Sequence, residues 1–257
     1  IKMKSLKRTL WMLMAGALLL SNVYSGYGQT TVTIGSGTSS SGSYPFASFW
    51  DYGWSASIYL AGEISAPGGV VVTSLAWYVA NTPANYTMIN QSVYLSHTTA
   101  SDWPSGSTQP STAGMTLVYQ GDITYNGSGW HTLNLQVPFA YNGTDNLLVY
   151  IDNYDGDYLT GYPTFRYTSM SPNYMMLYRA TDNSYPSGGG TRSTARSNIQ
   201  ITYISPPPLD GAMTAITGPV APAPPGANPV VATLANFGTN PINSATIDAL
   251  SMKDIDD

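Results

Sequence analysis

Short runs of alternating apolar and polar residues, set apart by Gly, Pro, Asn and Ser, recur through residues 30–204 of this 257-residue chain. In residues 131–137, every second position from His131 to Val137 is aromatic or aliphatic, and Thr, Asn and Gln lie between. This alternation is typical of strands with one buried face, and no helical stripe of useful length interrupts it. We predict strands at 31–34, 70–79, 91–96, 116–119, 131–137, 147–152, 174–179 and 199–204.

The segment from Gly129 to Tyr158 shows how these strands should begin and end. Pro138 has no N–H to donate, so it should end the ladder of the strand before it. Asn142-Gly143 favours a positive-φ turn. Residues 147–151 are apolar on both faces, which is typical of a central strand. These features predict two strands and a turn, and the spacing of the strands along the chain indicates a β-sandwich or jelly roll.

The pattern changes at residues 205–209, Ser-Pro-Pro-Pro-Leu, where three prolines favour a stiff linker. Beyond it we expect strands at 212–217, 230–236 and 245–250, which resemble the first three of an immunoglobulin-type sandwich. Such a domain needs about 100 residues, so we expect it to continue beyond residue 257. The predicted fold is therefore all-β: a jelly-roll-like β-sandwich at 29–204, followed by an incomplete immunoglobulin-like β domain at 210–257.

The N-terminal residues have the pattern of an export signal. A basic segment at 3–8 precedes twelve mostly apolar residues at 9–20, and small and polar residues follow through Gly28. A membrane anchor would need about 20 apolar residues, so a cleaved signal peptide at 1–28 is favoured over an anchor helix. We expect a chain that is secreted or on the outer cell surface, without membrane insertion once the signal is removed.

Charge and cysteine content narrow the functional classes. After residue 28 the chain has five basic residues and fourteen acidic ones, and five minus fourteen gives a net charge of −9. So few cations cannot neutralise nucleic-acid phosphates or an anionic membrane surface, which excludes both as partners. The chain has no cysteine, so its core must hold without disulfides.

A cluster of acidic residues at 152–157, Asp-Asn-Tyr-Asp-Gly-Asp, is a candidate metal site. The carboxylates of Asp152, Asp155 and Asp157 supply the oxygen ligands that Ca²⁺ prefers, and Gly156 lets the chain turn back on them. The spacing differs from that of an EF-hand, and its terminal Glu is missing. The alternative is a solvated Asp/Gly turn without metal.

Catalytic motifs are lacking. The only histidines, His97 and His131, lie on predicted strands or strand ends, without a GxSxG elbow or an HExxH zinc pattern. The only glutamate, Glu63, would need an aspartate partner to form a glycosidase pair, and that alternative stays open. We predict no catalytic residues and no enzyme activity.

Aromatic residues are the better candidates for binding. Four of them lie within residues 50–59, and others lie in loop-like surroundings. Exposed rings can stack on sugars or anchor an interface, whereas buried rings fill the core. We expect the loop residues to contact a ligand, and these are Trp103, Tyr158 and Tyr162.

Several segments resemble a β-sandwich module that is common in large secreted surface proteins of Bacteroidetes. Its marks are a "VYLSHT" strand at 93–98, a "GWHTLNL" strand at 129–135 and a "PFAYNGTDNLLV" hairpin at 138–149. Residues 210–242 likewise resemble the start of a CARDB domain, an immunoglobulin-type module related to cell adhesion. Architectures of this kind often continue into further β domains and a type IX secretion sorting domain. The resemblance implies a surface or adhesion role and transfers no catalytic residues.

Together these features favour a non-catalytic extracellular adhesion or ligand-binding module of a secreted bacterial protein, with a glycan or protein partner. Two alternatives remain. The first is a structural spacer of a larger secreted enzyme, such as a peptidase or glycoside hydrolase. The second is an enzyme built on the sandwich itself, with Glu63 and an aspartate.

Overall fold

The computed structural model describes residues 28–66, 68–205, 211–218, 231–236 and 241–243. The chain divides into a unit at Gln29–Ser205 and a second unit that contains two described strands. The division falls at the start of the proline run. The expected signal peptide, apart from Gly28, and the expected strand at 245–250 lie outside the described residues.

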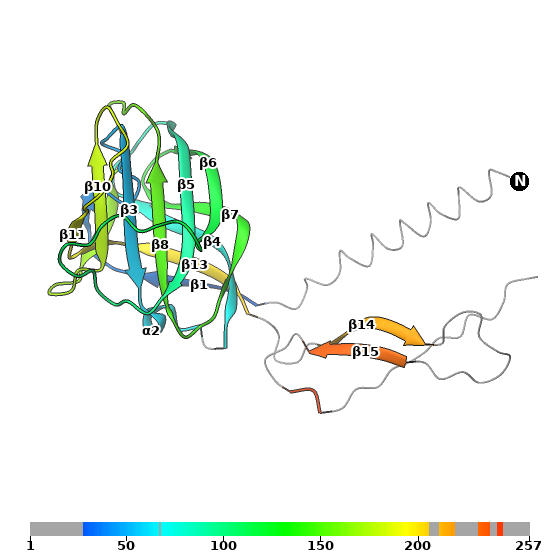
Figure 1. Ribbon diagram of the computed structural model, residues 1–257. Coiled ribbons are helices and arrows are strands. Elements are labelled where there is room, and N and C mark those ends of the chain that lie inside the picture. Colours follow the sequence, from blue (N-terminus) through cyan, green and yellow to red (C-terminus); the bar gives the residue numbers. More distant parts are fainter. Residues whose placement is uncertain (1–27, 67, 206–210, 219–230, 237–240, 244–257) are drawn as a thin grey trace, which may run out of the picture. The chain divides into compact units, whose positions relative to one another are not determined.

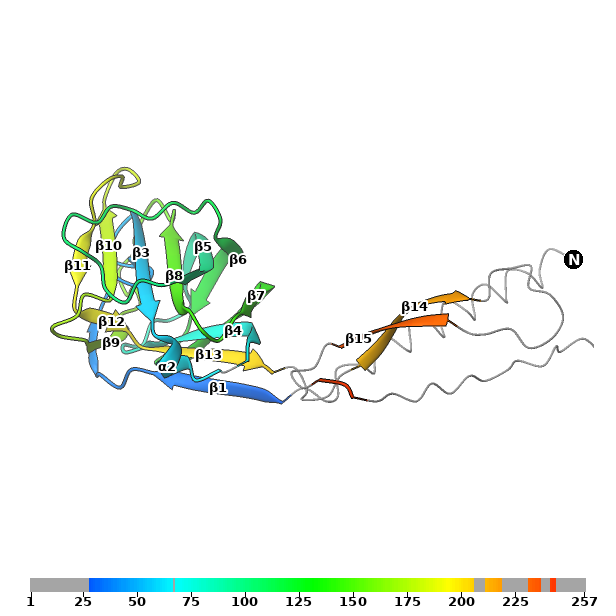
Figure 2. The ribbon, with the colours of Figure 1, turned by 60° about the horizontal axis from the view of Figure 1, so that its bottom comes forward.

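The first unit is a sandwich of two antiparallel sheets, which confirms the all-β fold (Figure 1). Sheet A contains β1 (Gln29–Ile34), β2 (Ser39–Ser41), β4 (Val70–Val79), β7 (Gly129–Tyr141), β9 (Phe165–Ser169), β12 (Ala195–Ser197) and β13 (Ile199–Ile204). Sheet B contains β3 (Tyr52–Tyr59), β5 (Tyr86–Thr98), β6 (Thr116–Tyr125), β8 (Asn146–Asn153), β10 (Met176–Thr181) and β11 (Thr191–Ser193). Strands of sheet A run across those of sheet B rather than alongside them in both views (Figure 2).

The main core fills the space between the sheets and is rich in aromatic rings. Phe46, from the segment before β3, is fully buried, and its ring lies 4.9 Å from that of Trp77 on β4 and 5.4 Å from that of Phe165 on β9. The inward residues of β13, which alternate as predicted, complete this layer: Ile199, Ile201 and Tyr203. This extensive burial of aromatic and aliphatic side chains stabilises the fold without a disulfide.

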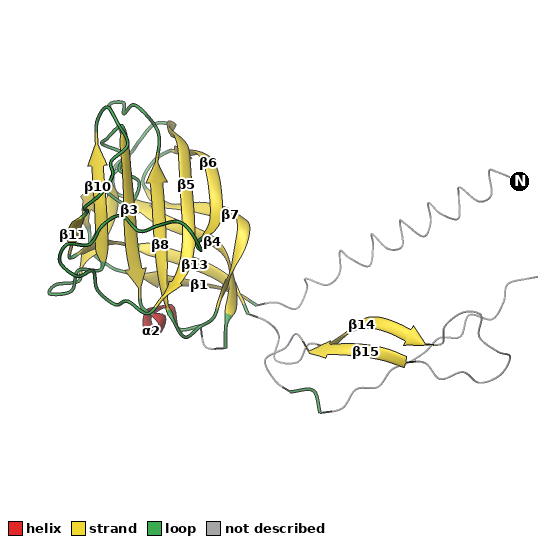
Figure 3. Cartoon of the chain, in the orientation of Figure 1, coloured by secondary structure: helices red, strands yellow, loops and turns green. Residues whose placement is uncertain are grey.

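A second, smaller core lies on the outer face of sheet B, and we call it the outer cluster. Its buried members are Trp54, Ala56, Ile58, Leu148, Tyr150 and Leu177, with Leu60, Tyr94, Trp103, Met115 and Tyr185 packed against them. Loops cross the front of this sheet and cover it (Figure 3). β8 therefore contributes to both cores, with Leu147 and Val149 on one face and Leu148 and Tyr150 on the other. The prediction of a central strand is confirmed.

The prediction that Pro138 ends its strand was wrong, because β7 continues to Tyr141. Pairing with β4 stops after Asn134 and resumes at Phe139, so Pro138 lies where the ladder needs no donor. Within this interruption, the side-chain amide of Gln136 exchanges two hydrogen bonds with the backbone of Gln120 on β6, at 2.9 and 3.1 Å. A side chain thus links the edges of the two sheets.

The prediction of a hairpin at 138–149 was also wrong. β7 pairs with β4 in sheet A, whereas β8 pairs with β3 and β5 in sheet B. The Asn142-Gly143 turn is present, with φ of +74° at Gly143, but it passes between sheets. A Cβ at Gly143 would collide with the carbonyl of Ala66, so glycine is required there.

β3 and β9 are the longest strands that the alternation did not predict. β3 is central in sheet B, and its inward face has small polar residues, Ser55 and Ser57, that are almost fully buried. The hydroxyl of Ser55 donates to the carbonyl of Pro45 at 2.7 Å, which satisfies it inside the protein. Because the inward residues Ser55 and Ser57 are polar, β3 lacks the apolar alternation from which strands were predicted.

The second unit contains β14 (Gly211–Gly218) and β15 (Val231–Asn236), paired antiparallel. They correspond to two of the three strands expected there. Met213 and Leu234 are exposed in this pair. Its assignment to an immunoglobulin-type domain stays a prediction. No helix in the described part of the chain has the length and apolar character needed to cross a membrane.

Candidate functional site

Two of the three predicted ligand-binding aromatics come together at the surface. The rings of Tyr158 and Tyr162 lie 6.3 Å apart, and each lies 5.2 Å from the ring of Phe49. Trp50 continues the group, 5.4 Å from Phe49. We call these four residues the aromatic patch. Phe49 and Tyr158 are 38% and 37% exposed, and Leu159 beside them is 63% exposed.

Local contacts hold the aromatic patch in place. The backbone N–H of Phe49 donates to the carbonyl of Gly42 at 3.0 Å, which closes the loop before β3. The ring of Tyr162 packs directly over Gly42, where a Cβ would lie only 2.9 Å away. The side chain of Asn81 donates to the Tyr162 carbonyl at 2.8 Å. The rings are therefore preorganised, which lowers the entropic cost of binding a ligand.

A pocket of about 480 Å³ adjoins the patch, and we call it the β10-edge pocket. It is lined by Ser43, Trp50, Tyr178, Arg179, Ala180, Thr181, Gly189, Gly190 and Thr191. Trp50 belongs to both features and joins them.

The pocket exists because β11 begins to pair with β10 only at Thr191, so the end of β10 has no partner strand on that side. β10 pairs with β3 through Thr181, but its pairing with β11 ends at Tyr178↔Thr191. The chain before β11 is a run of three glycines, 188–190. A Cβ at Gly190 would lie 2.6 Å from the Trp54 ring, so only glycine lets the backbone pack there. The glycine run thus carries the chain away from β10 and leaves that edge open.

Arg179 is the charged residue of the pocket. Its Nη1 donates to the carbonyls of Ser187 and Gly189, at 2.8 and 3.0 Å. The only ion pair among the described residues is Arg196–Glu63, so no carboxylate neutralises Arg179 there. Arg179 was not predicted as a site residue, although it is one of only five basic residues after position 28.

Trp103, the third predicted ligand contact, does not join the patch. It is partly buried against the outer cluster, and its indole N–H is buried without a partner among the described residues. Its backbone N–H donates to Tyr174, and its carbonyl accepts from Arg192, both at 2.9 Å. These contacts give Trp103 a packing role.

The structure does not assemble the predicted calcium ligands. Asp152 is 7% exposed, and its Oδ1 accepts hydrogen bonds from the hydroxyls of Tyr150 and Tyr185 in the outer cluster. Asp155 instead accepts from the backbone N–H of Ile89 at 3.2 Å. Among the residues described, no group of three His, Cys, Asp or Glu side chains is placed to hold a metal ion.

The two carboxyls also differ in their electrostatics. Burial raises the pKa of Asp152 above its usual range, although the hydroxyls of Tyr185 and Tyr150 act to lower it. Burial, opposed by the N–H of Ile89 and reinforced by nearby aspartates, raises the pKa of Asp155 to about 6. Those aspartates are Asp157, Asp122 and Asp51.

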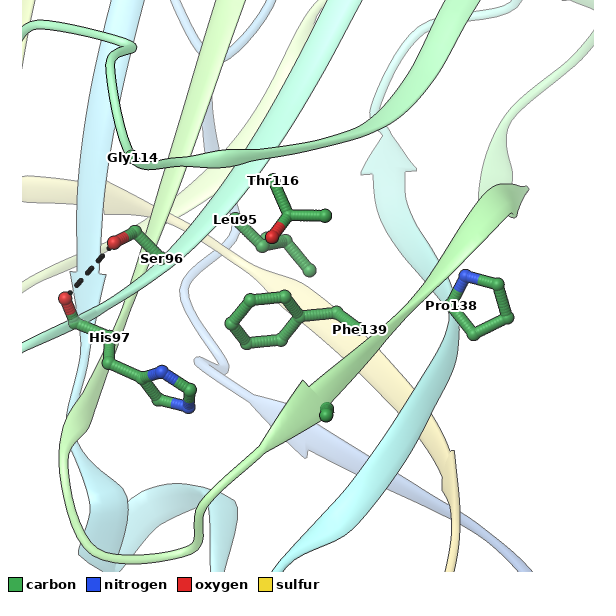
Figure 4. A pocket seen from close by; sticks show the side chains of 8 residues that line it. Leu95, Ser96, His97, Gly114, Thr116, Pro138 and Phe139 are labelled. Carbon is green, nitrogen blue, oxygen red and sulfur yellow. Dashed lines mark hydrogen bonds between the residues drawn. The ribbon is translucent and has the colours of Figure 1, made fainter.

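The histidines make backbone contacts. His97 lines a pocket of about 370 Å³ with Ser96 beside it, yet the Ser96 hydroxyl donates to the His97 carbonyl rather than to its ring (Figure 4). The Nε2 of His97 accepts from the N–H of Asn142 at 3.0 Å. The Nε2 of His131 lies 3.0 Å from the Gly127 carbonyl. Neither contact forms a nucleophile–base pair.

Glu63, in the short helix α2 (Ala61–Ile64), is held by a buried arginine. Arg196 is 2% exposed, and its two Nη atoms donate to the two carboxylate oxygens of Glu63 at 2.6 and 2.8 Å. Burial acts to raise the pKa of Glu63, but hydrogen bonds from Arg196 and the Leu60 N–H outweigh it and lower the pKa. The pair fastens α2 to the sandwich.

Comparison of the chain with family models, with curated proteins and with solved structures finds no match. The resemblance of residues 30–204 and 210–242 to bacterial surface modules therefore stays a prediction.

Proposed function

We propose that the sandwich is a non-catalytic extracellular glycan-binding module of a secreted or surface-exposed protein. The aromatic patch and the β10-edge pocket form its binding surface. The observation that carries this proposal is the set of partly exposed rings, Phe49, Tyr158 and Tyr162, that lie within 5.2 to 6.3 Å of one another beside a pocket. Export is proposed from the pattern of residues 1–28.

Flat rings suit sugars because the C–H face of a pyranose is apolar while its edge carries hydroxyls. The patch offers apolar ring area, and the pocket next to it offers the hydroxyls of Ser43 and Thr191. Because loop contacts already fix the rings, little side-chain entropy is lost on binding. The site therefore combines a stacking surface with hydrogen-bonding groups.

The size of the site favours a sugar over a protein partner. A stable protein interface buries about 1,200 Å² or more in total, whereas small-ligand pockets are about 300 to 1,000 Å³. The β10-edge pocket, at about 480 Å³, lies in the second class. The non-catalytic part of the proposal is supported by the engagement of His97 and Glu63 in other contacts.

The test is a glycan array probed with the chain from Gln29 onward and with a Phe49→Ala/Tyr158→Ala variant. We expect the variant to lose binding while its melting temperature changes little, because both rings are more than a third exposed. Trp130→Ala is the matched control, because this partly buried ring packs against Tyr78 on sheet A and is not part of the site. It should bind normally.

Three outcomes would contradict the proposal. Loss of folding in the double variant would mean that the rings are core residues. Turnover of a bound glycan would mean that the module is an enzyme. Absence of binding to any glycan would favour the alternative, a structural spacer of a larger secreted protein.

A further inference from the structure

We propose that the β10-edge pocket binds a sugar residue that carries a single carboxylate, and that Arg179 holds this carboxylate. The inference rests on the proposed glycan-binding function and names the chemical class of the ligand. A hexuronic acid and a sialic acid both carry one carboxylate, and either could occupy one position of an otherwise neutral glycan.

The first observation is the electrostatic isolation of Arg179. Of the four arginines in the sandwich, Arg196 is neutralised by Glu63, and the guanidinium groups of Arg166 and Arg192 lie over tyrosine rings at 3.9 and 4.1 Å. Arg179 lines the β10-edge pocket. Because Arg179 has no acidic partner in the part of the chain that the structure describes and the rest of the chain is acidic, this side chain attracts a ligand that carries one negative charge.

The second observation is how Arg179 is anchored. Its Nη1 makes both hydrogen bonds to the loop carbonyls of Ser187 and Gly189. The other donors, Nε and Nη2, have no partner among the described residues. These two N–H groups lie on the same edge of the planar guanidinium, and their spacing matches the two oxygens of a carboxylate. The anchored side chain thus keeps a bidentate edge for a ligand.

The third observation is the remainder of the lining, which suits a sugar ring. Trp50 supplies an aromatic wall, and its indole N–H donates to the Ser43 hydroxyl at 3.3 Å, which fixes the ring. The hydroxyl of Ser43 can still donate its own proton, and Thr191 adds a second hydroxyl. The net charge of −9 after residue 28 disfavours a polyanion, so a single acidic residue between neutral sugars fits better than a polyuronate.

The test is isothermal titration calorimetry with pairs of oligosaccharides that differ only in the charge. One pair is a neutral oligosaccharide ending in a hexuronic acid and its methyl ester, and the other is sialyllactose and lactose. We expect the chain from Gln29 onward to bind one acidic member roughly tenfold or more tighter than its neutral partner, as a charge-assisted hydrogen bond provides. The pair that shows this preference identifies the source of the carboxylate.

Two variants assign the preference to Arg179. Arg179→Gln should abolish the preference, so that the acidic and neutral members of the pair bind with equal affinity, whereas Arg179→Lys should retain part of it through its charge. Thermal unfolding of both variants reports whether the loop that Nη1 anchors stays in place. If Arg179→Gln unfolds, two other measurements test the inference. Arg179→Lys should keep part of the preference for the acidic member, and in the unchanged protein that preference should weaken with added salt, because salt screens a contact between Arg179 and a carboxylate.

Equal affinity for the acidic and neutral members in both pairs would overturn the inference while leaving the glycan-binding function intact. A preference that survives in folded Arg179→Gln would also overturn it. Absence of binding to every glycan tested would instead overturn the proposed function itself.

Discussion

Two groups of loop aromatics on the same sandwich have opposite environments. Trp103 and Tyr185 lie in loops over sheet B and pack on buried residues of the outer cluster. Phe49 and Tyr158 also lie in loops, yet each is more than a third exposed and packs mainly on other rings. The difference comes from the surface beneath each loop. Sheet B presents an apolar outer face on which Trp103 and Tyr185 pack, whereas the ring contacts of Phe49 and Tyr158 are to one another and to Trp50 and Tyr162.

The largest expected effect is on the packed side of this comparison. Trp103→Ala should lower the free energy of unfolding by about 2 to 4 kcal/mol, because it leaves a cavity over the outer cluster. Urea denaturation at neutral pH measures this change. A loss below about 0.5 kcal/mol would show that Trp103 is a surface residue and would remove the distinction between the two groups.

The hydroxyl of Tyr185 should matter next. It donates to the buried carboxylate of Asp152 and accepts from the side-chain amide of Gln109 at 2.8 Å. Tyr185→Phe leaves this network without one member, which should cost about 1 to 2 kcal/mol of unfolding free energy. Tyr158→Phe is the control, because it removes a hydroxyl from an exposed ring and should have no measurable effect in the same denaturation experiment.

Asp155 should give a smaller effect, and one that depends on pH. Its pKa is about 6 in the folded protein, above the usual value near 4, so folding favours the protonated form. Its contribution to stability is present below about pH 4 and is lost as the pH rises to about 6. Asp155→Asn keeps the oxygen that accepts from Ile89, so it should raise the melting temperature at pH 7.5 but not at pH 4. An equal shift at both pH values would contradict this.

The smallest expected change in stability is on the exposed side. Tyr158→Ala should alter the free energy of unfolding by less than about 0.5 kcal/mol, because Tyr158 is 37% exposed and its ring contacts are to Phe49 and Tyr162 at the surface. The same denaturation series measures it beside Trp103→Ala. A loss comparable to that of the tryptophan variant would show that the aromatic patch is part of the core, and the proposed binding surface would fall with it.

Apolar alternation located much of the sandwich. The ranges of β4 and β13 agree with the predicted 70–79 and 199–204, and β8 is central as its two apolar faces indicated. The same reasoning missed β3, whose inward face is filled by buried serines. It also placed the end of β7 at Pro138, because a ladder interruption cannot be distinguished from a strand end by one proline.

For the site, residue type indicated candidates but not neighbours. Tyr158 and Tyr162 were found from their loop context, but Phe49 and Arg179, which lie more than a hundred residues from one another, were not. Asp152 and Asp155 are three residues apart in sequence, yet one contacts the outer cluster and the other the backbone of β5. Proximity in sequence gave no guide to which side chains converge.

The sequence by itself determined the β class, most strand positions and the scarcity of charge, because these follow from local periodicity and composition. The tertiary structure decided which aromatic residues are buried, that Asp152 and Asp155 have different contacts, and where a pocket forms. Those outcomes depend on long-range pairing: β11 pairs with β10 only from Thr191 onward, and loops pack on the apolar outer face of sheet B. Whether a residue is buried depends on the side chains that pack against it, and these come from strands that are distant in the sequence.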